Sequence, residues 1–434
     1  MTKIHIKTWG CSLNKSDSEM MAGLLKEARF EIVDDPEEAD VLILNSCTVK
    51  TPSENSLLKE IEKYKDSYKI IIIAGCVAQT DPAKLSRYAL VGTKQIHKIV
   101  EVVEEALNEN TICNLSQEEN PVLELPKIRN NPIIEIIPIC RGCLGNCTYC
   151  KTKAARGELI SYPIKDIKLR VRKALREGAK EIWLTAQDCG CYGFDINTNL
   201  SNLLNEIISI EWDFKIRVGM MNPNHILKIK NELIQVYRNE KIFKFLHLPV
   251  QSGNNELLKT MNRKYKVEDF NNLVKEFKTH FPNLTLATDM IVGFPGETDQ
   301  QYWETLSLTR HLSPEIINIS RFWPREKTPA ARMKNQIPGE EIKRRSRVLA
   351  DIFKNISRLN NEKWIGREME ILIDEKGQER RNEQTGKTIQ QWIGRNSSYK
   401  PVIVEGDFNL GDKIKVNIFK ISDWDLRGRV INHS

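Results

Sequence analysis

The sequence of 434 residues contains no long hydrophobic run. Its longest apolar stretch lies around residues 70–74, whereas a helix needs about 20 apolar residues to cross a bilayer. The first residues, MTKIHIKTWGC, have no apolar core of the kind found in secretory signal peptides. We therefore expect a cytoplasmic protein. Its ten cysteines then favour metal ligation over disulfides.

The most distinctive motif of the chain has only three closely spaced cysteines. Cys143, Cys147 and Cys150 follow the pattern CxxxCxxC. Soft thiolates suit an iron–sulfur cluster, and three of them leave one iron open to a substrate or cosubstrate. The alternative is a structural zinc site, although zinc prefers CxxC pairs and a full tetrahedral ligand set.

Composition sets broad limits on the protein. The length predicts two or three domains, and 40% hydrophobic with 28% charged residues is ordinary for a globular protein. The net charge of +7 permits a polyanionic partner such as RNA.

The first section, residues 1–115, predicts a small parallel α/β sheet. Short apolar runs at 3–9, 41–45 and 69–74 are expected to be strands, with helices at 16–26, 53–64 and 97–107. Cys11, Cys47 and Cys76 each follow one of these strands. Because loops past the carboxyl ends of parallel strands converge, the three thiols are predicted to form one site. Three unrelated buried thiols are the alternative.

A polar linker is expected at 116–132, and residues 133–355 then repeat a strand–helix pattern. The expected strands are 133–139, 181–185, 215–219, 243–248, 285–291 and 316–319, and helices are expected at 167–177, 200–208, 267–279 and 299–312. Six such units predict a partial TIM-like (β/α)6 barrel with its chemistry at the strand carboxyl ends.

The third section, residues 364–432, is rich in β signals. Strands are expected at 368–374, 401–404, 413–418 and 427–431, separated by turn phrases such as Glu-Gly-Asp. We expect a small antiparallel, OB-like barrel.

Five short motifs, in order along the chain, resemble the radical S-adenosylmethionine (SAM) methylthiotransferase family. They are Gly10-Cys11 with Asn14 and Asp17–Glu19, NSCTV at 45–49, GCVAQ at 75–79, HLPVQSG at 247–253 and DMIVGFPGET at 289–298. The CxxxCxxC loop is that of radical SAM enzymes. The last section resembles the TRAM domain, an RNA-binding module.

The phrase KTKAARG at 151–157 resembles the archaeal and eukaryotic branch that modifies threonylcarbamoyladenosine (t6A) in tRNA. EIWLT at 181–185 and GMMNP at 219–223 point the same way. Eukaryotic members carry a carboxy-terminal membrane anchor that this chain lacks, so an archaeal-type enzyme is expected. Cys140, Cys189 and Cys191 depart from the family pattern and are expected to be ordinary thiols.

The resemblance implies two 4Fe-4S clusters, one on Cys143, Cys147 and Cys150 and an auxiliary one on Cys11, Cys47 and Cys76. The first would cleave SAM to a 5′-deoxyadenosyl radical that takes hydrogen from C2 of the adenine at position 37 of tRNA. The second would present sulfur that a second SAM methylates before transfer to C2. The residues implied in SAM binding are Tyr149, Glu181, Arg217 and Gln251, although Arg217 also reads as a salt-bridged surface residue.

Lys151, Lys153 and Arg156 are the expected substrate contacts. A buried carboxylate needs a cation, which favours the carboxylate of t6A over an apolar isopentenyl group. Contact with phosphate is the alternative. Basic residues 343–347 and the interleaved cations and aromatics of the last section are further candidates for RNA contact.

Other functions remain open at this point. The acceptor could be isopentenyladenosine in tRNA or an aspartate of a ribosomal protein, and a non-catalytic iron–sulfur RNA-binding sensor is a third class. The enzyme reading also implies a one-electron reductant, such as ferredoxin or flavodoxin, and a sulfur donor.

Overall fold

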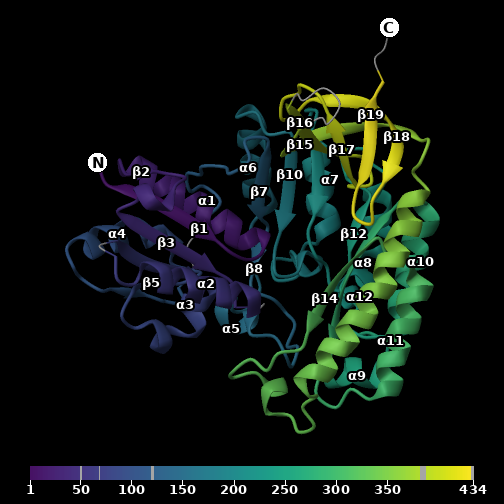
Figure 1. Cartoon of the computed structure of the whole chain (residues 1–434), viewed down its shortest axis with the longest axis horizontal. Coiled ribbons are helices and arrows are strands. Elements are labelled where there is room, and N and C mark those ends of the chain that lie inside the picture. Colours follow the sequence, from purple (N-terminus) through teal and green to yellow (C-terminus); the bar gives the residue numbers. More distant parts are fainter. Residues whose placement is uncertain (49–50, 68, 119–121, 382–387, 432–434) are drawn as a thin grey trace.

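The computed structural model describes residues 1–48, 51–67, 69–118, 122–381 and 388–431. Val49 of the NSCTV motif and the side chain of Arg381 lie outside this described part. Three parts follow one another along the chain: an amino-terminal sheet, a central arc of strands and helices, and a carboxy-terminal barrel (Figure 1). Among the described residues, no helix combines the length and apolarity needed to span a membrane.

The amino-terminal sheet is parallel throughout, in the order β2-β1-β3-β4-β5-β6. Its strands are β1 Lys3–Thr8, β2 Glu31–Ile32, β3 Val41–Ser46, β4 Ile70–Gly75, β5 Ala89–Val91 and β6 Cys113–Asn114. Its helices are α1 Ser12–Glu27, α2 Thr51–Tyr64, α3 Cys76–Thr80 and α4 Ile99–Leu107, with 3-10 turns η1 Pro36–Glu38, η2 Pro82–Leu85 and η3 Ile96–Lys98. The predicted parallel sheet is confirmed, with β2, β5 and β6 added at its edges.

Alternation along the strands gives this sheet two apolar faces. Ile43 and Ile72 belong to a core shared with α1 and α4, whereas Leu44 and Ile73 belong to a second core shared with α2. Because side chains alternate across a strand, one apolar run supplies both cores. The helices therefore cover both faces, and the carboxyl edge is left for the loops that carry cysteines.

The central part is an open arc of parallel strands. Two three-stranded sheets, β7-β10-β11 and β12-β13-β14, are joined by a parallel bridge from Ile216 to Ile242. The strands are β7 Ile134–Pro138, β10 Glu181–Thr185, β11 Lys215–Val218, β12 Phe245–His247, β13 Thr285–Val292 and β14 Ile316–Arg321. A hairpin of β8 Cys140–Arg141 and β9 Ile160–Ser161 flanks the cysteine loop. The predicted six-unit arc is confirmed.

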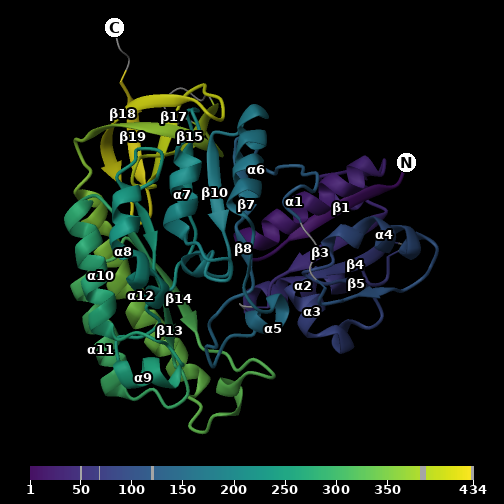
Figure 2. The ribbon, with the colours of Figure 1, turned by 180° about the vertical axis from the view of Figure 1, so that it is seen from behind.

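Most helices of this part line the outside of the arc, whereas the short helix after the cysteine loop lies against the amino-terminal part (Figures 1 and 2). The helices are α5 Thr152–Arg156, α6 Ile164–Arg176, α7 Leu200–Ile208, α8 Pro223–Tyr237, α9 Asn255–Thr260, α10 Val267–His280, α11 Asp299–Leu312 and α12 Gly339–Glu362, with 3-10 turns η4 Cys189–Cys191 and η5 Pro329–Arg332. Helices α5, α8 and α9 were not predicted as elements, whereas a helix was expected to begin at the basic run 343–347, within α12. One large apolar core fills the space between the helices and the strands.

The carboxy-terminal barrel closes in the order β15-β16-β17-β19-β18. Its strands are β15 Glu368–Arg381, β16 Thr388–Arg395, β17 Pro401–Glu405, β18 Lys413–Ile421 and β19 Leu426–Val430. One pairing, β17 with β19, is parallel and the others are antiparallel. The barrel prediction is thus confirmed in architecture but differs at this pairing and in the presence of β16.

The barrel sits on the amino ends of the central strands, away from the cysteine loop (Figure 1). The Lys244 amide, just before β12, donates to the Ser397 carbonyl at 2.8 Å. Asn131, just before β7, donates to the Asp374 carbonyl at 2.6 Å. The expected linker is also anchored, because buried Lys127 forms ion pairs with Glu19 and Glu135.

Candidate active site

The amino-terminal cysteines converge at the carboxyl edge of the parallel sheet. Cys11 precedes α1 after β1, Cys47 follows β3, and Cys76 opens α3 after β4. These strands are neighbours in the order β1-β3-β4, so their loops share one edge. The thiols of Cys11 and Cys76 lie 3.7 and 3.9 Å from a single acceptor, the Asn14 Oδ1 atom.

Residues of the matching motifs hold this edge together. Asn45 Nδ2 donates to the Asn14 carbonyl at 2.9 Å and to Ser18 Oγ at 2.8 Å, which ties the β3 loop to α1. A Cβ atom on Gly10 would approach Cys47 Cβ to 2.6 Å, and one on Gly75 would approach Asn45 Oδ1 to 2.2 Å. Both glycines have positive φ, +131° and +86°, so side chains are excluded by strain as well as by space.

The electrostatic environment favours a thiolate at Cys76, whereas burial raises the pKa of the Cys11 thiol. A hydrogen bond with Cys47 and the nearby charge of Arg156 lower the pKa of Cys76 to about 6, although burial acts in the opposite direction. Thiolates are the form that binds iron. The donor set of three converging thiols therefore fits a cluster with three protein ligands.

The second triad lies within one loop after β7 and β8. Gly145 stands between two of its sulfurs: its amide donates to Cys143 Sγ at 3.2 Å, and a Cβ on it would lie 3.8 Å from Cys147 Sγ. The Cys150 amide donates to the Cys147 carbonyl at 3.1 Å, which folds the loop back on itself. Burial raises the pKa of Cys143 to about 12, with contributions from Asp188. This triad too fits a three-thiolate cluster.

Arg263 is a site residue that the sequence analysis missed. Its Nη1 donates to Cys147 Sγ at 3.1 Å, its Nε donates to Tyr265 Oη at 3.1 Å, and Nη2 bonds to Asn222 Oδ1. It follows α9, which is itself bound to the cysteine loop through the hydrogen bond from Asn262 Nδ2 to the Asn146 carbonyl at 2.7 Å. An isolated arginine between two helices carried no sequence signal for this role.

Tyr149 and Gln251 lie on the same side of the arc as this loop. Tyr149 packs edge-on against Phe294, with ring centroids 6.4 Å apart. Gln251 follows β12, forms a bridge with Met290 of β13 and has a φ of +70°. A non-glycine residue in this strained region at a strand end is a feature of functional loops.

Glu181 and Arg217 lie elsewhere, so their expected contact with SAM finds no support in this placement. Glu181 is the first residue of β10, at the amino end of the arc, and accepts from Trp183 Nε1 at 2.5 Å. Arg217 stacks against the rings of Trp183, Phe245 and Tyr399 at 4.8, 4.9 and 5.2 Å. Tyr399 belongs to the carboxy-terminal barrel, so both residues line its junction with the arc.

The three expected substrate cations already have partners. Lys151 binds Asp81 at 2.5 Å and Arg156 Nη2 binds Asp17 Oδ2 at 2.7 Å, both across the boundary between the first two parts, and the second pair is fully buried. Lys153 differs, because its partner Glu158 at 2.6 Å is 78% exposed. Exchange of that weak surface partner for another carboxylate costs little.

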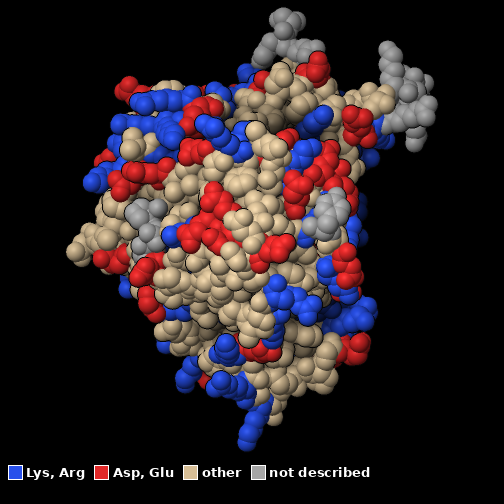
Figure 3. Space-filling view, turned by 90° about the vertical axis from the view of Figure 1, so that its left-hand side faces the viewer, with Lys and Arg blue, Asp and Glu red and all other residues tan. Residues whose placement is uncertain are grey.

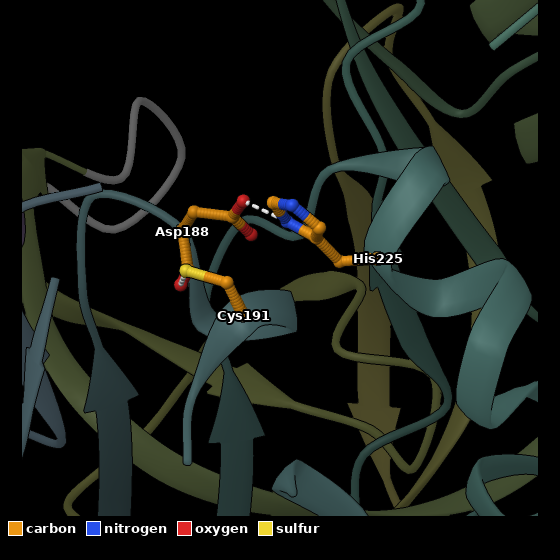
Figure 4. A group of neighbouring side chains, drawn as sticks. All are labelled: Asp188, Cys191 and His225. Atoms are coloured by element: carbon orange, nitrogen blue, oxygen red, sulfur yellow. Dashed lines mark hydrogen bonds and ion pairs between the residues drawn. The ribbon is translucent and has the colours of Figure 1, made fainter. Parts of the chain in front are cut away.

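A further buried group, Asp188, Cys191 and His225, has the ligand types of a metal site (Figure 4). However, the Asp188 carboxylate accepts four hydrogen bonds, from Gly190 N, Asn222 N, Asn222 Nδ2 and His225 Nδ1, at 2.7–2.9 Å. Both oxygens are therefore saturated without a metal. Cys140, Cys189 and Cys191 are all buried beside it, in agreement with the expectation of ordinary thiols.

Comparisons with known proteins match all three parts of the chain. Residues 3–92 match the uncharacterized protein family UPF0004, residues 137–309 the radical SAM superfamily and residues 362–431 the TRAM domain. The structure of the radical S-adenosylmethionine methyltransferase TsrM from Kitasatospora setae superposes with a TM-score of 0.54 at 13% identity, over 76% of this chain and 77% of that one. At this identity the likeness shows the fold alone.

These matches define the class, a radical SAM enzyme with an added amino-terminal sheet and a TRAM domain. A probable threonylcarbamoyladenosine tRNA methylthiotransferase of Pyrococcus abyssi is 46% identical over 87% of this chain and 90% of its own length. The threonylcarbamoyladenosine tRNA methylthiotransferases of Xenopus laevis and Homo sapiens are each 38% identical, over 100% and 99% of this chain and 78% and 74% of their own lengths. The chain belongs to the threonylcarbamoyladenosine tRNA methylthiotransferase family.

Proposed function

We propose that the protein methylthiolates C2 of threonylcarbamoyladenosine at position 37 of tRNA, with two 4Fe-4S clusters and two SAM molecules per turnover. The observation that carries this proposal is the presence of two complete three-cysteine sites on adjoining strand edges, in a chain of this family. A sensor needs one such site, whereas sulfur insertion needs a radical source and a sulfur carrier.

Cys143, Cys147 and Cys150 would hold the radical SAM cluster, and Cys11, Cys47 and Cys76 the auxiliary cluster. When bound, such clusters supply one-electron chemistry and an open iron. The role of Arg263 is to orient Cys147 by its hydrogen bond to the sulfur. Tyr149 and Gln251 remain the proposed SAM contacts, because they lie at the carboxyl edge of the arc beside this loop.

Lys153 is the proposed contact for the carboxylate of the threonylcarbamoyl group. It lies at the cysteine loop, where its Nζ also donates to the Cys143 carbonyl at 2.6 Å. Its present carboxylate partner, Glu158, is exposed and replaceable. Lys151 and Arg156 instead form ion pairs between the first two parts, so the structure supports their expected role in substrate binding less well than that of Lys153.

The proposed RNA contacts divide between the TRAM barrel and the loops near the cysteines. In the barrel, Arg429 stacks on Phe419 at 4.4 Å, and Trp424 is 61% exposed. Exposed aromatics beside cations suit unpaired bases. By contrast, Arg344 and Arg345 of the basic run 343–347 are paired with Glu341. On the face of Figure 3, basic and acidic residues are interspersed, so that face offers no single basic patch.

The proposal includes domain boundaries and partners. The domains would be an amino-terminal domain at 1–115, a linker at 116–132, a radical SAM domain at 133–355 and a TRAM domain at 364–432. The partners would be tRNA, a one-electron reductant such as ferredoxin or flavodoxin, and a sulfur donor, in the cytoplasm.

The test is anaerobic turnover of the reconstituted protein with SAM, a reductant and purified tRNA. Two tRNAs are offered, one with threonylcarbamoyladenosine and one with isopentenyladenosine, and the nucleosides are analysed by mass spectrometry. The proposal predicts a methylthio product from the first tRNA only. Product from the isopentenyl tRNA alone would overturn the substrate, and no 5′-deoxyadenosine with either would overturn the enzyme class.

A further inference from the structure

Arg156 stands in an unusual environment for a cation. It ends α5, only six residues after Cys150, yet its side chain is 2% exposed and reaches the other cysteine site. Nη2 donates to Asp17 Oδ2 at 2.7 Å and to Asn14 Oδ1 at 3.0 Å. Asn14 Oδ1 is the same atom that lies within 4 Å of the Cys11 and Cys76 sulfurs.

Most of the donor capacity of this guanidinium is unused. Nε and Nη1 are buried and form no hydrogen bond to a nitrogen or oxygen atom of the described residues, although the guanidinium interacts with the Cys76 thiol. A buried donor left unpaired costs about 1–3 kcal/mol, so two of them on one side chain call for a partner. The thiols of Cys11 and Cys76 share the acceptor Asn14 Oδ1 with this guanidinium, so sulfur is the partner that the geometry offers.

We propose that Arg156 is a positioning residue of the auxiliary site, donating from Nε and Nη1 to the sulfur atoms held at Cys11, Cys47 and Cys76. This inference rests on the proposed cluster at those cysteines. Hydrogen bonds and positive charge at cluster sulfurs stabilise the reduced, more negative form and so raise the reduction potential. Because α5 belongs to the radical SAM loop, the auxiliary site is complete only when the two parts are docked.

The test uses the full chain carrying Cys147→Ala, so that the auxiliary cluster alone gives a signal. Arg156→Gln should shift the midpoint potential, followed by electron paramagnetic resonance, to a more negative value. It should also speed iron loss to a chelator by about 10–100-fold. Arg156→Lys, which keeps the charge but not the planar fork, should fall between. The matched control is Arg170→Gln, which removes an equally buried arginine bound to Glu135, away from both triads.

Removal of Arg156 leaves Asp17 buried and unpaired, and the variant could then fail to fold. The double variant Asp17→Asn with Arg156→Gln replaces both charges, with Asp17→Asn alone as its reference. A lower potential and faster iron loss in the double variant support the proposal, and values equal to the reference overturn it. If the Cys147→Ala parent holds no cluster at all, the proposed function fails instead.

A second, independent observation concerns Trp323, which is 59% exposed in the loop after β14. That loop is bound to the cysteine loop, because the Ala330 amide donates to the Thr148 carbonyl at 2.9 Å. It also reaches the amino-terminal part through the ion pair of Glu326 with Lys84 at 2.8 Å. The loop that carries this exposed indole therefore contacts both cysteine-bearing parts.

Four exposed cations belong to the same segment of the chain as Trp323. Arg321, Lys327, Arg332 and Lys334 are exposed, and none forms an ion pair with a described residue. Indole faces stack on unpaired bases, and free cations bind phosphates. We infer that this surface receives the unpaired bases of the tRNA anticodon loop, which again rests on the proposed function.

Binding of tRNA by the full chain without SAM tests this surface. Trp323→Ala should weaken binding by roughly 5–100-fold, the range for loss of one base stack, and Trp323→Phe should retain most of it. Trp303→Ala is the matched control, because Trp303 is 61% exposed but lies on α11, where Arg310 stands 5.9 Å from its ring. Equal binding by Trp323→Ala and the parent overturns the inference, whereas no binding by the parent overturns the proposed function.

Discussion

The two cysteine sites are built in opposite ways. Cys143, Cys147 and Cys150 come from one loop, whose fold is fixed by short-range contacts such as the Gly145 amide with Cys143 Sγ at 3.2 Å. The amino-terminal site gathers three loops separated by 36 and 29 residues, held together through Asn14 and Asn45. A local site depends on its own loop and its immediate support, whereas an assembled site depends on the packing of a whole domain.

The largest expected effect comes from Cys147→Ala. Two thiolates hold a cluster poorly, so formation of 5′-deoxyadenosine from SAM should fall by at least about 100-fold. Iron at the amino-terminal site should remain. Cys113→Ala is the control, because Cys113 is exposed and belongs to neither triad. Cleavage of SAM at the parent rate would remove Cys147 from the radical site.

Cys47→Ala should separate the two activities. The radical loop is untouched, so 5′-deoxyadenosine should still form, while methylthio product disappears. The protein should bind about half the parent iron if each site holds an equal cluster. Mass spectrometry of the nucleosides and an iron assay measure both. Methylthio product at the parent level would mean that the assembled triad is structural.

A smaller effect is expected from Arg263→Gln, which leaves all six cysteines in place. Loss of the donor to Cys147 Sγ should lower SAM cleavage by about 10–100-fold. In a Cys47→Ala background, the spectrum of the radical cluster should change, and Arg263→Lys should restore part of it. A purely structural role predicts a lower melting temperature with an unchanged spectrum.

The smallest effect on either cysteine site is expected from Glu181→Gln, at the amino end of the arc. Burial, with repulsion from Asp374, raises the pKa of Glu181 to about 7, and burial raises that of Asp374 to about 6. The folded state therefore holds protons that the unfolded state releases above about pH 4.5. The stability that these bound protons contribute is fully present below about pH 4.5 and is lost as the pH rises through the folded pKa of about 7.

Glu181→Gln should remove that loss. We compare the unfolding free energy of the variant with that of the parent at pH 5 and at pH 8. The difference should shift in favour of the variant by on the order of 1–2 kcal/mol between pH 5 and pH 8. Denaturant unfolding at the two pH values measures this gain, and SAM binding should be unchanged. Weaker SAM binding with no pH-dependent gain would restore the expected contact of Glu181 with SAM.

The sequence predicted the parts that depend on local pattern and strand direction. The CxxxCxxC loop is contiguous, and the convergence of Cys11, Cys47 and Cys76 follows from the carboxyl ends of parallel strands meeting at one edge. The same reasoning places Glu181 at the amino end of its strand, away from both cysteine sites, since it opens a strand that was itself predicted correctly.

Partners across the boundary between parts could not be predicted. Arg156 was expected to face the substrate, but α5 turns this last side chain toward Asp17. Nothing in the phrase KTKAARG indicates that direction. Lys151 likewise meets Asp81, which lies 70 residues earlier in the chain. Such pairs depend on how two separately folded surfaces dock, and a single sequence carries no periodicity that records it.

Helix α12 connects the central arc to the carboxy-terminal barrel. Its first turns contact the loop after β13 through Arg345 and Glu297, and its last residues bind the barrel through Asn361 and the Ser422 carbonyl. A helix of 24 residues is about 36 Å long. This single helix therefore links the loop after β13 to the carboxy-terminal barrel, so the two ends of the arc are held at a fixed separation.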